Sequence, residues 1–371
     1  MKVTCKSDMP TAAQAILASV RPPPTQPSSP LPPPLPAVEI DNAKRALAPG
    51  VPLSAWLRAA GSPPFSALLG PSSVALPCCA AAYVDAHPRV PFSEALYAPD
   101  GSDLPRSPLV WSGLTAAWPS LRGWDAPSLA ARCAPDDLFA LDGGPGFARE
   151  GLHSASVRMA AFAAYASPAG GAADLDIAPL YVFDPLVATR RFADGALMCA
   201  EFSVPQCLSC DEMLARGGAG SAARPLPARW LLVGSAGSGT PIHNHPLTAA
   251  WNTLLCGVKL WVVLPPSAPP EALLVGDACP AAGDEDLSAA AWLRHWGGAL
   301  PPGAAAIVQR EGETVFLPAG WWHVVLNVTP TTALSSSLYL RRDWEELGER
   351  AVERGDCEGF SRVFRAEAGK G

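Results

Sequence analysis

Residues 234–265 read GSAGSGTPIHNHPLTAAWNTLLCGVKLWVVLP, and this stretch carries the pattern that decides the predicted fold and chemistry. His243 and His245 are separated by a single residue within a segment rich in residues that favour β-strands. Successive side chains on a strand point to opposite faces, so residues two apart share a face. We therefore expect both imidazoles to face one cavity and Asn244 to face away from it.

Lys259 is the second unusual residue of this stretch, because it lies alone in the apolar run Val258–Leu264. Burying an ammonium group without an anion is costly. Such a lysine lies either at an exposed strand edge or beside an anion. Together with the two histidines, it indicates a metal and an acidic cosubstrate.

The composition bounds the class of protein. The chain has 371 residues, 49% of them hydrophobic, which is enough for one large domain or two ordinary ones. Its net charge is −7 and it has no run of basic residues, which argues against general nucleic-acid binding. No apolar run approaches the ~18–20 residues that span a bilayer, so no membrane role is expected. The ten scattered cysteines fit reduced thiols, so we expect an intracellular protein of the nucleus or cytoplasm, with organelle targeting left open.

The composition and the hydrophobic pattern change along the chain and suggest four regions. Residues 1–50 include a proline tract at 21–36 that cannot form a packed core, and we expect this segment to be disordered. Residues 51–105 form an Ala- and Pro-rich accessory region in which no chemistry is evident. Residues 106–341 have the pattern of a β-rich catalytic domain, and residues 342–371 that of two charged helices.

Short strands joined by Gly and Pro turns dominate the third region. Strands are predicted over Pro108–Trp111, Ser154–Arg158, Pro179–Asp184, Arg229–Val233, Ala306–Val308 and Thr332–Leu340. Helices are predicted over Ala160–Ser167, Cys210–Ala215, Glu271–Val275 and Glu285–Trp296. Because the helices fall at the periphery, the pattern favours a mainly β fold, either a barrel or a double sheet.

A third histidine, His323, follows the turn at residues 318–320 and starts another predicted strand. It lies 80 residues after His243, and these two stretches hold three of the six histidines in the chain. A His-x-His pair that faces one cavity, with a third histidine on a separate strand, predicts a metal site. Imidazole suits Zn, Cu, Fe and Ni, so the ligands alone do not select the metal.

Three segments together resemble a known family. They are PLYVFD (179–184), RWLLVGSAGSGTPIHNHPLTAAWNTLLCGVKLWVVLPP (229–266) and GETVFLPAGWWHVVLNVTPTTALS (312–335). They resemble the JmjC-domain 2-oxoglutarate oxygenases, above all the subgroup of the nuclear lysyl hydroxylase and proposed arginine demethylase once called the phosphatidylserine receptor. The resemblance extends over about Ser107–Tyr339. It implies a double-stranded β-helix, a jelly-roll barrel of the cupin type, for residues 106–341.

The resemblance also implies cofactors and site residues. The family binds Fe(II) and 2-oxoglutarate at one mouth of the barrel and uses O2 to hydroxylate a C–H bond. His243 and His323 match its two iron-binding histidines, and Lys259 matches the residue that pairs with the distal carboxylate of 2-oxoglutarate. The other positions that match cosubstrate-binding residues are Tyr181, Thr240, Asn252 and Ser335, the last standing where the subgroup has threonine.

The sequence departs from the family at His245, which stands where a carboxylate ligand is expected. Three alternatives stay open. His245 itself completes a neutral three-histidine Fe(II) site, or the domain is a catalytically silent binding scaffold, or the three histidines hold another metal such as zinc. The retained lysine and hydrogen-bonding residues favour the first alternative, because they serve only the cosubstrate.

The resemblance implies a protein or peptide substrate, with hydroxylation of lysine or demethylation of N-methylarginine as the reaction. The net charge of −7 suits a basic peptide. The predicted C-terminal helices at 342–354 and 358–368 could close a homodimer, as in related oxygenases.

Overall fold

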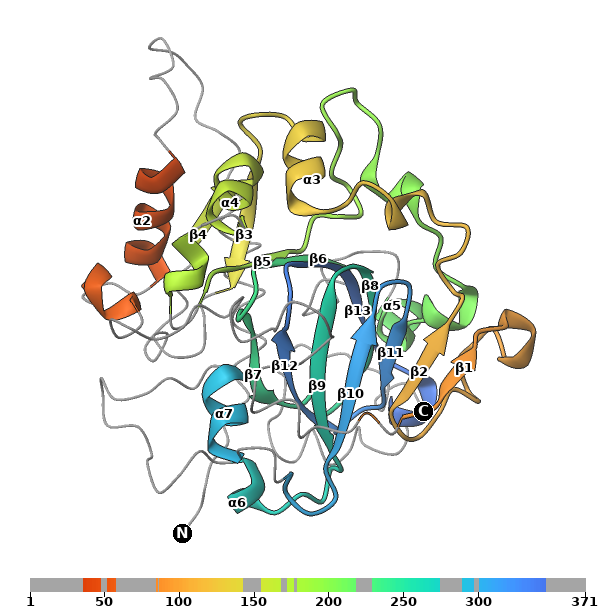
Figure 1. Cartoon of the computed structure of the whole chain (residues 1–371). Helices are drawn as coiled ribbons and strands as arrows, with labels where there is room; N and C mark the ends of the chain where they lie inside the picture. Colours follow the sequence, from red (N-terminus) through yellow and green to blue (C-terminus); the bar gives the residue numbers. More distant parts are fainter. Residues whose placement is uncertain are drawn as a thin grey trace.

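A computed structural model gives the fold. It describes residues 36–47, 52–57, 85, 87–142, 155–167, 172–176, 179–217, 229–273, 289–296 and 300–344. Two β-sheets lie face to face at the centre, and helices pack around them (Figure 1). The mainly β, two-sheet fold predicted from the sequence is confirmed.

The larger sheet has nine strands in the order β1-β2-β11-β8-β13-β6-β5-β3-β4, and the smaller has four in the order β10-β9-β12-β7. The larger sheet comprises β1 (Arg89–Pro91), β2 (Leu109–Ser112), β3 (Leu138–Asp142), β4 (Ala155–Arg158), β5 (Tyr181–Asp184), β6 (Arg229–Gly234), β8 (Ala249–Cys256), β11 (Thr314–Leu317) and β13 (Thr331–Leu338). The smaller comprises β7 (Gly239–His243), β9 (Val258–Leu264), β10 (Ala305–Arg310) and β12 (Trp322–Asn327). Because neighbours in each sheet come from distant parts of the sequence, the barrel brings separate motifs together.

The helices are short. They are α2 (Pro36–Leu47), α3 (Ala126–Arg132), α4 (Met159–Tyr165), α5 (Glu212–Gly217), α6 (Pro270–Leu273) and α7 (Ala289–Trp296). Single 3-10 turns occur at Leu53–Trp56, Glu94–Leu96, Pro119–Leu121, Ala172–Leu175, Met198–Glu201 and Gln206–Leu208. Helices α2, α3 and α4 gather beside β3 and β4, while α7 covers β7 and β12 (Figure 1).

The apolar run of β9 is explained by burial on both of its faces. Leu260, Val262 and Leu264 pack outward in a cluster with the helix α7. Trp261 and Val263 pack inward, between the sheets. Strands buried on both faces have near-continuous apolar sequences rather than alternating ones. Lys259 belongs to the inward-facing set.

The structure differs from the sequence prediction at residues 36–47, which form helix α2 instead of a disordered segment. Ile40, Ala43 and Leu47 recur at helical spacing and are buried in the main core. The remainder of residues 1–50 lies outside the described residues. So do the predicted C-terminal helices beyond Trp344.

Residues 51–105 also contribute to the sheet, because β1 pairs in parallel with β2 at its edge. The region is therefore part of the β architecture at Arg89–Pro91 rather than only an accessory. The predicted helices within Ser107–Trp296 are present in the described residues, each within a few positions of its expected place.

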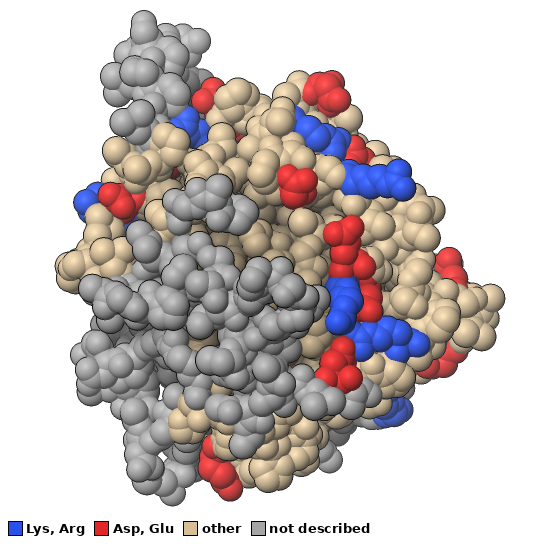
Figure 2. Space-filling view, viewed as in Figure 1, with Lys and Arg blue, Asp and Glu red and all other residues tan. Residues whose placement is uncertain are grey.

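The surface shows no segregation of charge on the face drawn in Figure 2. There, acidic and basic side chains of the described residues lie next to one another, many of them in a band to the right of the centre and others at the upper left (Figure 2). Among the helices that the structure describes, none is both long and apolar enough to cross a membrane.

Candidate metal and cosubstrate site

Three histidines meet at one end of the smaller sheet. His243 ends β7 and His323 lies directly opposite it on β12, with ring centroids 4.0 Å apart. His245 lies in the turn after β7, with its ring centroid 5.1 Å from that of His243 and 5.3 Å from that of His323. One ligand nitrogen from each ring lies within 4.8 Å of the other two. The predicted convergence of His243 and His245 is present, although His245 reaches it from a turn and not from the strand.

Backbone carbonyl groups orient two of these rings. The Nδ1 atom of His243 lies 2.7 Å from the oxygen of Pro241, and that of His323 lies 3.1 Å from the oxygen of Trp321. An Nδ1–H that donates to a carbonyl group leaves the Nε2 lone pair free for a metal. The arrangement is the usual one for histidine ligands.

Burial keeps the three imidazoles neutral. It lowers the pKa of His243 and lowers the pKa of His323 well below the ordinary 6.5. Burial and the proximity of His243 lower the pKa of His245 to about 3. Neutral imidazole is the form that binds metals, so the donor set fits a divalent transition metal.

Lys259 lies inside the barrel, fully buried. Its Nζ atom donates to the hydroxyl of Tyr181 at 2.8 Å and to Oδ1 of Asn327 at 2.6 Å. Both partners are uncharged, and burial lowers the lysine pKa to about 7. In the described part of the chain, no carboxylate forms an ion pair with this ammonium group. Its surroundings fit an anionic ligand better than an empty cavity.

One cavity of about 60 Å³ between the two sheets joins the metal-ligand candidates to Lys259. All the predicted site residues line it: Tyr181, Thr240, His243, His245, Asn252, Lys259, His323 and Ser335. The rest of its wall is apolar: Phe183, Leu232, Ala250, Trp251, Trp261, Val315, Leu317 and Val325. The structure thus brings together every residue singled out from the sequence.

The strand register explains the shape of the cavity. On β9, Val263 lies opposite His323 and Lys259 lies opposite Asn327. Asn327 follows His323 by four positions on β12. Four residues of strand span about 13 Å of backbone. His323 and Lys259 nevertheless line the same cavity, which therefore extends from the metal-ligand candidates to the ammonium group.

Two polar side chains face the cavity from the larger sheet. Asn252 and Ser335 lie opposite each other on β8 and β13. Ser335 Oγ donates to the carbonyl of Trp251 at 3.1 Å, whereas Oδ1 of Asn252 is buried without a hydrogen-bond partner. A buried amide oxygen without a partner is costly. Rotation of the amide by about 180° would point its N–H groups into the cavity, where they could donate to an anionic ligand.

Asn327 is a site residue that sequence reasoning missed. Its Oδ1 accepts from Lys259 and also from Thr331 Oγ1 at 2.9 Å, while its Nδ2 donates to Ser238 Oγ at 2.8 Å. The signal was available, because Asn327 is four residues after His323 on one strand and therefore shares its face. The amide holds the ammonium group in place without neutralising it.

Comparison with known proteins agrees with this geometry. The family model described as "JmjC domain, hydroxylase" matches residues 230–337, which hold all three histidines and Lys259. Residues 230–337 form a JmjC domain. The cupin-type fold expected from the resemblance is thereby confirmed for the barrel.

Proteins similar to this chain carry several names. A Caenorhabditis briggsae protein named bifunctional arginine demethylase and lysyl-hydroxylase psr-1 is 33% identical over 246 residues, 62% of this chain and 55% of that protein. The Caenorhabditis elegans protein of the same name is 31% identical over 264 residues, 66% of this chain and 61% of that protein. A Gallus gallus protein named 2-oxoglutarate and iron-dependent oxygenase JMJD4 is 31% identical over 112 residues, 29% of this chain and 25% of that protein. The chain spans somewhat over half the length of the two nematode proteins.

Proposed function

We propose that the chain is an Fe(II)- and 2-oxoglutarate-dependent dioxygenase that hydroxylates a protein side chain. His245 takes the place of the usual carboxylate ligand. The observation that carries the proposal is the single cavity in which three convergent histidines and a buried lysine face each other. A metal site alone would not need Lys259, and an anion site alone would not need the histidines.

His243, His245 and His323 would hold the metal through their free ring nitrogens. The bound iron and 2-oxoglutarate would supply the oxidative chemistry that converts a C–H bond into C–OH with O2. For metal–nitrogen bonds of ~2.1 Å at right angles, ligand nitrogens lie about 3 Å apart. The present spacing, within 4.8 Å, requires only side-chain adjustment, which a half-buried turn residue such as His245 permits.

The neutral ligand set changes the charge balance. A carboxylate at position 245 would cancel one charge of a divalent metal, whereas imidazole cancels none. None of the described residues that line the cavity is an acid, so the bound dicarboxylate would be the anion next to the metal. Lys259 would bind the far end of the dicarboxylate. We expect metal and cosubstrate to bind with strong mutual cooperativity.

The remaining cavity residues orient the cosubstrate and exclude water. Tyr181 and Asn327 hold the ammonium group of Lys259. The Asn252 amide, whose oxygen has no partner among the described residues, would turn its N–H groups toward the cosubstrate. The apolar side chains of the opposite walls keep water from the reacting atoms. Thr240 and Ser335 add hydroxyl groups to the wall of the cavity.

For the substrate we propose a lysine or N-methylarginine side chain of a protein. The names of the nematode relatives support this choice, because they combine arginine demethylase with lysyl-hydroxylase. The net charge of −7 would favour a basic peptide. A peptide panel with lysine, methylarginine and neutral side chains, scored by hydroxylation or demethylation, tests this choice.

The alternative function is that of a silent JmjC scaffold, and the imidazole at position 245 is the observation that favours it. Anaerobic addition of Fe(II) and 2-oxoglutarate, followed by O2, separates the two. The dioxygenase is expected to develop a weak visible charge-transfer band and then release succinate.

Three variants make this experiment decisive. His245→Ala should lose succinate release and show a weaker or shifted band, while His295→Ala on the exposed face of α7 should keep both signals. No signal in the wild type, with both signals restored in His245→Asp, would contradict an active three-histidine site. Metal analysis of the purified protein also separates iron from a zinc-holding site.

A further inference from the structure

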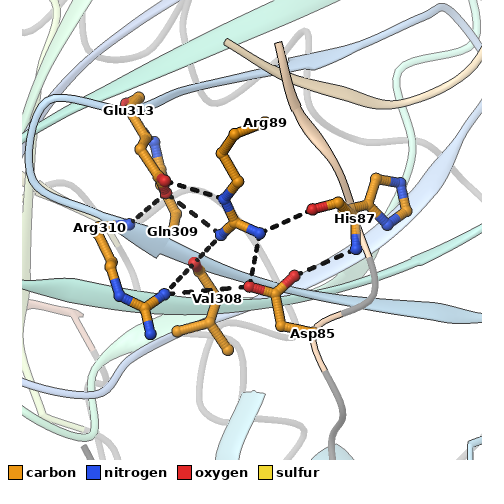
Figure 3. Close-up of polar contacts among 7 residues, drawn as sticks. All are labelled: Asp85, His87, Arg89, Val308, Gln309, Arg310 and Glu313. Atoms are coloured by element: carbon orange, nitrogen blue, oxygen red, sulfur yellow. Dashed lines mark hydrogen bonds and ion pairs between the residues drawn. The ribbon is translucent and has the colours of Figure 1, made fainter. Parts of the chain in front are cut away.

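An ion-pair cluster lies at the turn between β10 and β11 (Figure 3). The Arg89 guanidinium lies at its centre and contacts carboxylate oxygens of Asp85 at 2.7 Å and of Glu313 at 2.9 Å. It also donates to the carbonyl oxygens of Val308 at 2.5 Å and of His87 at 2.8 Å. The cluster ties the strand β1 segment to the turn that follows β10.

Gln309 also forms a hydrogen bond to this turn, through its side-chain amide. The backbone N–H of Arg310 donates to Glu313 Oε2 at 2.8 Å, and Gln309 Nε2 donates to the Glu313 carbonyl at 3.0 Å. Gln309 therefore connects the outer cluster to the interior of the barrel (Figure 3). Neither the predicted metal ligands nor the predicted cosubstrate residues include it.

The Gln309 side chain is fully buried, and its amide forms hydrogen bonds to the turn, to β8 and to β9. Besides the bond to the turn, Nε2 donates to the carbonyl of Asn252 on β8 at 2.8 Å. Its Oε1 accepts from the indole N–H of Trp261 on β9 at 2.8 Å. One side chain on β10 thus links the two sheets behind the cavity.

Both inward partners of Gln309 belong to the cavity wall. The Trp261 ring lies beside His323, with centroids 6.0 Å apart and planes at 29°. Asn252 lines the same cavity with its unpaired Oδ1. Gln309 itself faces Lys259 across the β9–β10 pair. A shift of this amide would therefore move the wall at the metal ligand and at the cosubstrate amide together.

We propose that Gln309 is a positioning residue that acts through Trp261 on His323 and through the Asn252 backbone on the cosubstrate subsite. This inference rests on the proposed function. Removing the amide leaves the Trp261 N–H buried without its partner, which frees the Trp261 ring to rotate, and takes one hydrogen bond from the Asn252 carbonyl. Residues that support a metal ligand from behind typically change metal affinity 10–100-fold when lost.

The test uses Co(II) as a spectroscopic probe in the full-length chain. Gln309→Leu should raise the Kd for Co(II) about tenfold and change the visible cobalt spectrum. It should also weaken 2-oxoglutarate binding to the Co(II) protein. Thr314→Val is the matched control, because it removes another buried hydrogen bond, 2.8 Å between Thr314 Oγ1 and Thr253 Oγ1, without touching Trp261. The control should lower thermal stability and leave the spectrum and both affinities unchanged.

A double-mutant cycle with Trp261→Phe shows whether Gln309 acts through the indole. Phenylalanine keeps a ring beside His323 but has no N–H for Gln309 to hold. The changes in the cobalt spectrum caused by Trp261→Phe and Gln309→Leu should then be strongly non-additive. Gln309→Met, which removes the amide with little change in side-chain length, serves as the second variant if Gln309→Leu does not fold, and it should change the spectrum in the same direction.

The outcomes separate this inference from the proposed function. A wild-type protein that binds Co(II) and 2-oxoglutarate, with Gln309→Leu matching Thr314→Val in spectrum and affinities, would overturn the positioning role alone. Additive effects in the cycle, or a Gln309→Met spectrum like that of the wild type, would also overturn it. A wild-type protein that binds neither probe would overturn both.

Discussion

Lys259 combines complete burial with two uncharged hydrogen-bond partners, Tyr181 and Asn327. Its charge state decides whether the cavity attracts a dicarboxylate. The sequence alone identified the residue, because a single lysine in an apolar run is rare and the JmjC resemblance names a partner for it. The Asn327 contact could not be predicted in the same way, because it depends on the register between β9 and β12.

The affinity for 2-oxoglutarate is expected to fall as pH rises above about 7. Burial lowers the Lys259 pKa to about 7 in the free protein, and the dianion binds the protonated form. Binding above this pH must therefore take up a proton. Calorimetry at pH 8 in two buffers of different ionisation enthalpy measures that uptake. A Kd independent of pH from 6 to 9, with no proton uptake, would show that Lys259 does not contact the cosubstrate.

Asn327→Asp is expected to raise the Kd for 2-oxoglutarate by about tenfold or more, because an opposite charge beside an ionisable group shifts its equilibrium by at least that amount. The new carboxylate would lie beside Lys259 Nζ, where the amide oxygen now lies at 2.6 Å, and would compete with the cosubstrate. Metal binding should change little. Asn42→Asp on the exposed surface of α2 adds the same charge elsewhere and should bind normally. Equal affinities in the two variants would argue against the assigned subsite.

At the scale of elements, helix α2 shows where sequence reasoning failed. The proline tract before it suggested an unpacked segment, yet Ile40, Ala43 and Leu47 have helical spacing and reach the core. Two buried ion pairs also fasten it: Glu39 with Arg158 and Lys44 with Asp176. Their partners lie more than a hundred residues away in the sequence, so the pairs could not be recognised before the fold was known.

Lys44→Met is expected to lower the free energy of unfolding by about 3 kcal/mol, the usual cost of removing one partner from a buried pair. Among the described residues, the loss would leave the fully buried Asp176 carboxylate with the Tyr165 hydroxyl, at 2.5 Å, as its remaining side-chain partner. Urea unfolding measures the change. Arg45→Met, at an exposed position of the same helix, is the control and should change stability by less than about 0.5 kcal/mol. Equal stabilities would show that the Lys44–Asp176 pair does not stabilise the fold.

At the scale of the whole molecule, three distant segments form one cavity. The smaller sheet pairs β7 with β12, and the larger sheet places β5, β8 and β13 opposite them. The motifs predicted this assembly, since His243, Lys259 and His323 belong to strands whose pattern is evident in the sequence. The link from Arg89 through Gln309 to Trp261 could not be predicted, because no local pattern marks a buried glutamine whose partners lie on three other elements.

The central claim, an iron site made of three neutral histidines, is tested most directly by X-ray absorption at the iron edge. The protein is loaded anaerobically with Fe(II) and 2-oxoglutarate for this measurement. The wild type should show scattering from three imidazoles at ~2.0–2.2 Å, and His245→Ala should show two. Two imidazoles in both proteins, or no bound iron in the wild type, would contradict the claim.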